Sequence, residues 1–121
     1  MKIVITTNKD SLDTEVSSRF GRCKYFGLVE VEDENIKEVE CVENEGAKQA
    51  HGAGIKASEQ VGNLGAEKII SGNIGPNASA VLNQLDIEVY KATGPVKKAI
   101  SDLVSGELKK VESTVSKHFG M

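Results

Sequence analysis

The chain contains only two arginines, Arg19 and Arg22, and they lie three residues apart in a polar segment. An arginine guanidinium presents planar, paired donors that suit anions with several acceptor atoms. Gly21 allows a turn that brings backbone N–H groups close to a ligand, and Cys23 adds a soft sulfur. The segment is therefore a candidate anion site. The alternative is a solvated loop whose arginines pair with carboxylates while Phe20 fills the core.

A second candidate is the glycine turn from Gly72 through Asn73 to Gly75, which follows a short apolar run and precedes Pro76. A strand, a glycine turn and a helix start present free N–H groups and the positive end of a helix dipole to an anion. The turn has neither the Gly-Lys-Ser/Thr of a P-loop nor the full Gly-x-Gly-x-x-Gly of a dinucleotide site. Two glycines also suit a turn that only accommodates the backbone, so both interpretations stay open.

Histidine and cysteine supply the candidate metal ligands. His51 falls at the start of a predicted helix, where a neutral imidazole can coordinate a metal, donate to an anion or simply cap the helix. Cys23 and Cys41 form no CxxC pair and have neither zinc nor iron–sulfur spacing. Two free thiols are typical of a cytoplasmic protein, and Cys41 is expected in the core. His51 and Cys23 are therefore the predicted metal ligands.

The elements that must position these residues follow from the hydrophobic pattern. The pattern predicts three strands, then a helix, a strand, a helix, a strand and a last helix. Strands that alternate with helices pair in parallel through right-handed crossovers, whereas the second and third strands form an antiparallel hairpin. We expect an α/β fold with a mixed five-stranded sheet and helices packed on it. The expected strands are 2–7, 25–32, 36–42, 68–70 and 87–90, and the expected helices about 50–64, 76–85 and 95–105.

This topology brings the candidate segments together. Loops that leave the carboxyl ends of strands in an α/β sheet meet in one crevice. That crevice would hold two arginines, a thiol, an imidazole and two turns rich in N–H groups. It offers no set of nucleophile, base and orienting group, so we expect no enzyme. Its chemistry suits a large anion that contains sulfur or metal.

Composition excludes several classes of function. The 121 residues carry a net charge of −3 and include three Phe, two Tyr and no Trp, which argues against nucleic-acid binding. No apolar stretch is long enough for a membrane span or a signal peptide, so a cytoplasmic location without membrane contact is expected. The length predicts a single domain over residues 1–105, followed by a charged tail over 106–121 that has no apolar face for the core.

Four segments together carry a resemblance to a known family: residues 18–23 with Tyr25 and Phe26, residues 51–55, residues 69–78 and residues 87–90. In order and spacing they resemble the dinitrogenase iron–molybdenum cofactor biosynthesis family (NifX-like, NafY-like and NifB C-terminal-like members, here as a small stand-alone chain). The resemblance covers about residues 1–105. It implies a ribonuclease-H-like fold and non-covalent binding of an anionic metal–sulfur cluster. The binding motifs of the family fall on Arg19, Phe20, Gly21 and His51, and Arg19 stands where some members have His.

The sequence thus predicts a protein that binds or carries an anionic metal–sulfur cluster of Fe/Mo/S or Mo/Cu/S type, with a cluster donor or acceptor protein as its partner. The alternative is a regulatory module that binds a small oxyanion or nucleotide. A nuclease is disfavoured because the first strand offers no carboxylate for a metal ion. The predicted binding residues are Arg19, Phe20, Gly21, Arg22, Cys23, His51, Gly72, Asn73 and Gly75.

Overall fold

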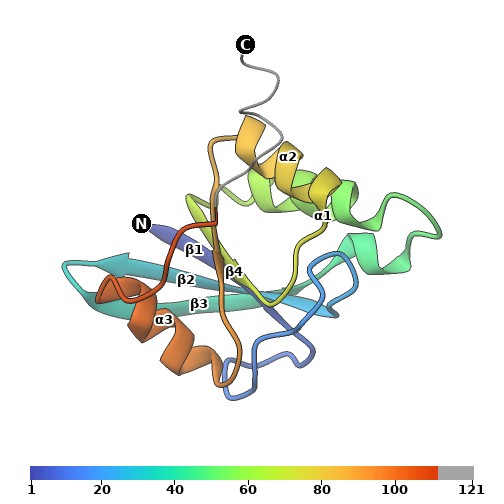
Figure 1. The fold of residues 1–121 in the computed structure, drawn as a ribbon. Helices are drawn as coiled ribbons and strands as arrows, with labels where there is room; N and C mark the ends of the chain where they lie inside the picture. The colour runs from blue at the N-terminus through green and yellow to red at the C-terminus, as the bar shows by residue number, and fades with distance from the viewer. Residues whose placement is uncertain (112–121) are drawn as a thin grey trace, which may run out of the picture.

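The structure is a computed structural model that describes residues 1–111, with every side chain except those of residues 38 and 39. A five-stranded sheet forms the middle layer of the described structure, and helices pack on both of its faces (Figure 1). In chain order the elements are β1 (Lys2–Thr7), β2 (Tyr25–Glu32), β3 (Asn35–Glu43), the 3₁₀ turn η1 (Glu45–Lys48), α1 (Ala53–Asn63), β4 (Lys68–Ser71), α2 (Pro76–Gln84), β5 (Glu88–Lys91) and α3 (Val96–Val104).

The sheet order is β3-β2-β1-β4-β5. The hairpin of β2 and β3 is antiparallel, β2 is antiparallel to β1, and β1, β4 and β5 are parallel to one another. The predicted mixed α/β class is therefore confirmed. Beyond β5, a single bridge pairs Tyr90 with Lys110 and adds a short stretch of chain to this edge.

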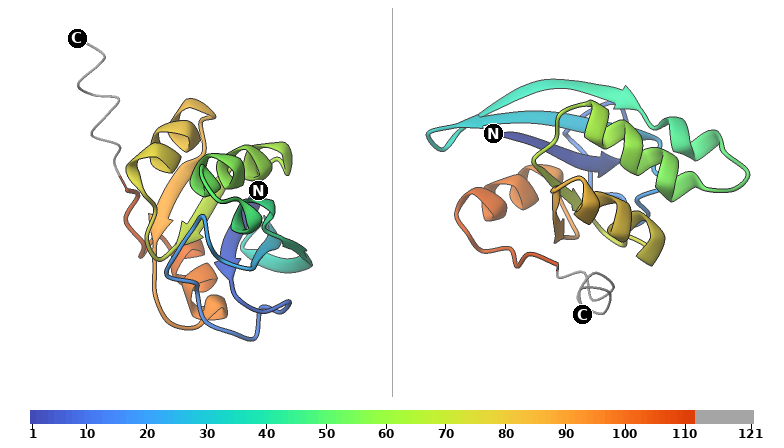
Figure 2. Two further views of the ribbon diagram at one scale, coloured as in Figure 1. Left: turned by 90° about the vertical axis from the view of Figure 1, so that its right-hand side faces the viewer. Right: turned by 90° about the horizontal axis from the view of Figure 1, so that it is seen from above.

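The central strand β1 is buried from Ile3 to Thr7, with an apolar centre at residues 3–5, and both of its faces are covered. Ile3 and Ile5 point to the face that α3 covers, where they join Ile100 in one core cluster. Val4 points to the opposite face and joins Leu82 of α2 in a second cluster. Figure 2 shows the resulting layers, with α1 and α2 side by side on one face and α3 on the other. The carboxyl ends of β1 and β4 thus face one end of a rigid, two-sided core.

The first helix begins at Ala53, about three residues later than its apolar pattern predicted. Gly52 adopts a left-handed conformation, with φ of +71°, immediately before the helix. That conformation turns the chain out of the helical path and is easy for glycine. As a result, His51 lies on the loop ahead of α1 rather than in its first turn.

The tail departs from its prediction. Leu108 packs, partly buried, against the core cluster on the α3 face. The Val111 N–H donates to the Val89 carbonyl at 2.7 Å, so the chain after α3 runs back along β5. Within residues 107–111, Leu108 therefore adds an apolar contact to the core, and the remaining tail residues, 112–121, lie outside the described part. None of the helices in residues 1–111 is long and apolar enough to span a membrane.

Candidate functional site

The loop after β1 lies directly against the turn after β4. Backbone N–H groups of Gly72 and Asn73 donate to the carbonyls of Ser17 and Ser18 at 3.0 and 2.9 Å, and the Phe20 N–H returns a bond to the Asn73 carbonyl at 3.1 Å. A Cβ on Gly72 would lie 2.5 Å from the Ser18 Cα, so only glycine permits this approach. The first two predicted candidate segments are therefore brought together by backbone pairing.

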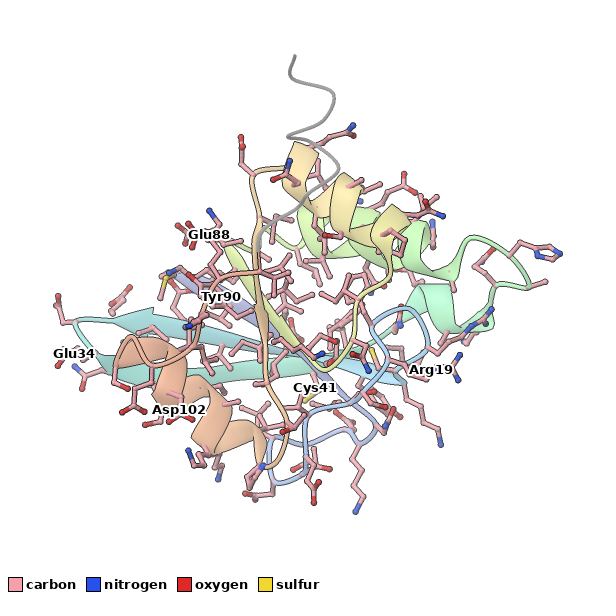
Figure 3. All side chains as sticks on the ribbon, in the orientation of Figure 1. Arg19, Glu34, Cys41, Glu88, Tyr90 and Asp102 are labelled. Carbon is pink, nitrogen blue, oxygen red and sulfur yellow. The ribbon has the colours of Figure 1, made fainter. Side chains whose placement is uncertain are left out.

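The start of α1 closes the third side. Gly21 lies so close to it that a Cβ would be 2.9 Å from the Gly54 nitrogen. Together with the start of α2, these segments enclose a cleft of about 460 Å³. Figure 3 shows the Arg19 side chain reaching out at this end of the molecule. The lining residues are Ser18, Arg19, Phe20, Gly21, Arg22, Gly52, Ala53, Gly54, Ile55, Asn73, Gly75, Pro76, Asn77 and Ala78.

The electrostatics of the cleft favour an anion. Its lining contains two arginines and no carboxylate. Neither α1 nor α2 has a side-chain cap or an acidic residue in its first turn. Within residues 1–111, no acceptor faces the first N–H groups of α1 (residues 53–55) or of α2 (residues 77 and 78). Unsatisfied donors at helix starts carry partial positive charge, so two such ends add to the charge of the arginines.

The two arginines differ in their hydrogen bonding. The Arg22 guanidinium donates from Nη1 to the carbonyls of Ala47 and Gln49 at 3.2 and 2.7 Å. It thereby holds the segment that leads from η1 to α1. The exposed Arg19 guanidinium has no hydrogen-bond or ion-pair partner in the described part of the chain. Arg19 is the cation left available for a ligand, and Arg22 supports the wall of the cleft.

Cys23 lies beneath the cleft rather than in it. Its thiol is fully buried and donates to the Phe20 carbonyl at 3.2 Å. Burial raises the pKa of the thiol to about 12, against a smaller lowering by the Asn44 amide. A protonated thiol without access to the cleft is a poor metal ligand. The geometry therefore favours Cys23 as a core residue that supports the loop, in place of the predicted ligand.

Some of the remaining predicted residues line the cleft, and others lie outside its lining. Asn73 and Gly75 line the cleft, whereas Gly72 is buried behind it. Phe20 lines the cleft and is also packed in the core, 2% exposed and with its ring centroid 5.8 Å from that of Phe26. His51 is exposed on the loop before α1 and is not among the lining residues. The structure therefore does not bring the two predicted metal ligands together.

The prediction missed Asn44, which is 1% exposed. Its Nδ2 donates to the Phe20, Gly21 and Cys23 carbonyls at 3.3, 3.2 and 2.9 Å. Its Oδ1 accepts from the Gly46 N–H at 2.9 Å, the geometry of an Asx turn. The sequence signal for that turn was present, an asparagine two residues before a glycine at the end of a strand. The contact with the loop at Gly21 had no local signal.

The part of the chain that the structure describes contains no preformed set of ligands for a single metal ion. There, no group of three or more His, Cys, Asp or Glu side chains gathers at a single point. The cleft instead offers a guanidinium and backbone N–H groups. This donor set fits a polyatomic anion, including a cluster whose outer atoms are sulfide, and does not fit a free cation.

Comparison with known sequences identifies the family. The sequence profile described as "Dinitrogenase iron-molybdenum cofactor" matches residues 1–106. The chain belongs to this family. Its similarity extends to a Methanocaldococcus jannaschii chain described as "Uncharacterized protein MJ0580", which is 39% identical over 113 residues, 93% of this chain and 92% of the relative.

Solved structures show the same fold. The apo form of the orange protein from Desulfovibrio gigas matches with a TM-score of 0.81 and 27% identity, over 93% of each chain. The crystal structure of PH0822 matches with a TM-score of 0.77 and 30% identity, over 92% of this chain and 96% of the other. The fold that positions the cleft is thus shared along nearly the whole length of these proteins.

Proposed function

We propose that this protein binds an anionic metal–sulfur cluster without covalent attachment and carries it to an acceptor protein. One observation carries the proposal. A single cleft whose described lining has no carboxylate contains the guanidinium of Arg19 and two helix starts, and within residues 1–111 neither that guanidinium nor those first N–H groups have a partner. The groups of residues 1–111 thus leave this positive charge uncompensated, and an anion is the ligand that would balance it.

The family supports the choice among anions, because its description names the iron–molybdenum cofactor. We propose a cluster of Fe/Mo/S or Mo/Cu/S type as the cargo and a ribonuclease-H-like classification for the fold. The function is binding rather than catalysis, since the residues that line the cleft include no nucleophile paired with a base. A cytoplasmic location accords with the reduced state of Cys23, whose thiol is buried.

Each group in the cleft has a proposed role. Arg19 supplies the full charge, and the N–H groups of residues 53–55, 77 and 78 hold the outer sulfides or oxygens of the anion. His51 lies outside the cleft lining, on the exposed loop that leads to Gly52 at the cleft, and we keep it as the candidate for a direct bond to a metal atom of the cargo. Cys23 is not assigned such a bond because its thiol is buried beneath the cleft. Holding the cargo by charge and hydrogen bonds leaves it free to transfer.

The experiment is anaerobic loading of the whole protein. The purified chain is offered iron with sulfide and, separately, tetrathiomolybdate with and without copper. It is then desalted, and bound metal is quantified beside the visible spectrum. Stoichiometric metal with a charge-transfer band is expected with at least one mixture. A colourless, metal-free protein under every condition contradicts the proposal. Thermal stabilisation by phosphate or a nucleotide alone would favour the oxyanion-binding alternative.

A further inference from the structure

The buried side chain of Asn44 is the only amide in the described part of the chain that contacts three carbonyls of one loop. Those carbonyls belong to Phe20, Gly21 and Cys23, so the loop turns its acceptors inward onto a single Nδ2 atom. The orientation of the amide is determined by its other end, because Oδ1 accepts the Gly46 N–H. Through Nδ2 on one side and Oδ1 on the other, Asn44 therefore links the loop to Gly46 of η1.

The direction of the carbonyls determines the direction of the neighbouring N–H groups. Every peptide bond described here is trans, and in a trans peptide the C=O and the following N–H point in opposite directions. When the carbonyls of Phe20 and Gly21 point at Asn44, the N–H groups of Gly21 and Arg22 point away from it. Neither N–H has an acceptor within residues 1–111, and both residues line the cleft.

We infer that the backbone N–H groups of Gly21 and Arg22 bind the anion, and that Asn44 is the positioning residue that directs them into the cleft. Successive N–H groups that face one side form a concavity for anions. This inference rests on the proposed function, since it adds two donors to the same site. It gives Asn44, an uncharged side chain outside the cleft lining, an indirect role in binding.

This position requires both the donor and the acceptor of an asparagine side chain. Nδ2 donates while Oδ1 accepts, and both are in use. Aspartate has the same shape but no donor when ionised, so it would repel the three carbonyls that asparagine holds. Replacement by aspartate is therefore expected to turn or loosen residues 20–23 without a change in side-chain size.

The first test uses the unaltered protein. Backbone amide shifts are followed by NMR during an anaerobic titration with tetrathiomolybdate. The amides of Gly21 and Arg22 are expected to shift along one binding curve with those of Asn77 and Ala78 at the start of α2. If only the α2 amides respond, the inference is overturned while the proposed function stands. If no amide responds and no metal is retained under any loading condition, the proposed function itself fails.

The second test compares Asn44→Asp with Asn63→Asp. The control makes the same chemical change at an exposed position on the last turn of α1, so both variants gain one negative charge. Equilibrium dialysis is expected to show about tenfold weaker tetrathiomolybdate binding for Asn44→Asp, the effect of losing one or two hydrogen bonds to a charged ligand, and little change for Asn63→Asp. Equal affinity of the two variants overturns the inference. If Asn44→Asp does not fold, the amide shifts of the unaltered protein decide.

Discussion

Two regions of the molecule treat positive charge in opposite ways. At the outer edge of β5, Glu88 accepts the Tyr90 hydroxyl at 2.9 Å and lies 3.3 Å from Lys68 Nζ and 4.0 Å from Lys110 Nζ. At the cleft, Arg19 has no partner among the described residues. Figure 3 shows Arg19 on one side of the molecule and the pair of Glu88 and Tyr90 on the other.

The difference separates structural charge from charge available to a ligand. The Tyr90 hydroxyl, followed by the Lys68 ammonium, lowers the pKa of Glu88 below its usual value, so this carboxylate is stabilised by the chain's own groups. The bond between Val111 and Val89 lies beside this cluster and brings the tail to β5. At the edge the charges are paired within the fold, whereas at the cleft Arg19 and the first N–H groups of α1 and α2 have no partner within residues 1–111, as the proposed anion site requires.

The largest effect is expected from removing the charge of Arg19. Arg19→Ala should weaken tetrathiomolybdate binding roughly tenfold to a hundredfold, because a hydrogen bond to a charged group contributes about 1.5–3 kcal/mol. The melting temperature should stay unchanged, since the side chain has no partner in the described structure. Equilibrium dialysis and thermal unfolding measure the two quantities.

Two further variants sharpen that result. Arg19→Lys keeps the charge and loses the planar pair of donors, so its affinity should lie between those of Arg19→Ala and the unaltered protein. Lys37→Ala removes one positive charge from the exposed edge strand β3 and serves as the charge-matched control. Equal losses of tetrathiomolybdate affinity for Arg19→Ala and Lys37→Ala would show that binding depends only on the net charge of the protein.

The next effect concerns the backbone contact that forms the cleft. Gly72→Ala should lower the free energy of unfolding by about 1–3 kcal/mol, the usual effect of overpacking, because its Cβ would overlap the Ser18 backbone. Gly75→Ala is the matched control. Gly75 has a φ of −67° and open space around a Cβ, so the change should stay within about 0.5 kcal/mol. Urea unfolding measures both, and equal destabilisation would contradict the importance of this contact.

The smallest effect is expected at the outer edge. The pKa of Glu88 is lower in the folded chain than in the unfolded chain, so its stabilisation is present at neutral pH and is lost as the pH falls through the folded value. Glu88→Gln should remove this part of the acid dependence and change neutral-pH stability by less than about 1 kcal/mol, since the carboxylate is partly exposed. Thermal unfolding across acidic pH measures it. Loss of tetrathiomolybdate binding in this variant would abolish the distinction between the two regions.

Much of the fold could be predicted because the spacing of apolar residues along the sequence indicates strands and helices. The run from Lys2 to Thr7 has an apolar centre, Ile3 to Ile5, whose side chains serve both faces, and it is the central strand. The start of α1 was misplaced because small residues continue the apolar spacing back to Ala50, whereas Gly52 turns the chain by its left-handed conformation. The contact of Leu108 with the core was missed because a single apolar residue in a charged tail has no period.

For the candidate site, the sequence indicated which segments come together, but it did not indicate where their side chains point. The glycines at positions 21 and 72 mark close approaches of backbone, and the structure contains both. Residue type and spacing could not show that Arg22 bonds to nearby carbonyls while Arg19 has no partner among residues 1–111. The role of Asn44 depends on a contact between residues more than twenty positions apart, which only the folded chain reveals.

The most direct test of the account is to map where an anion binds. Tetrathiomolybdate is titrated anaerobically into isotopically labelled protein, and the shift of every backbone amide is recorded. The account predicts that the largest shifts fall on the cleft, at residues 19–22, 53–55 and 77–78, and that amides of Glu88 and Tyr90 at the outer edge stay in place. Shifts centred on the β5 edge, or scattered over the surface without saturation, would contradict the claim that the cleft is the binding site.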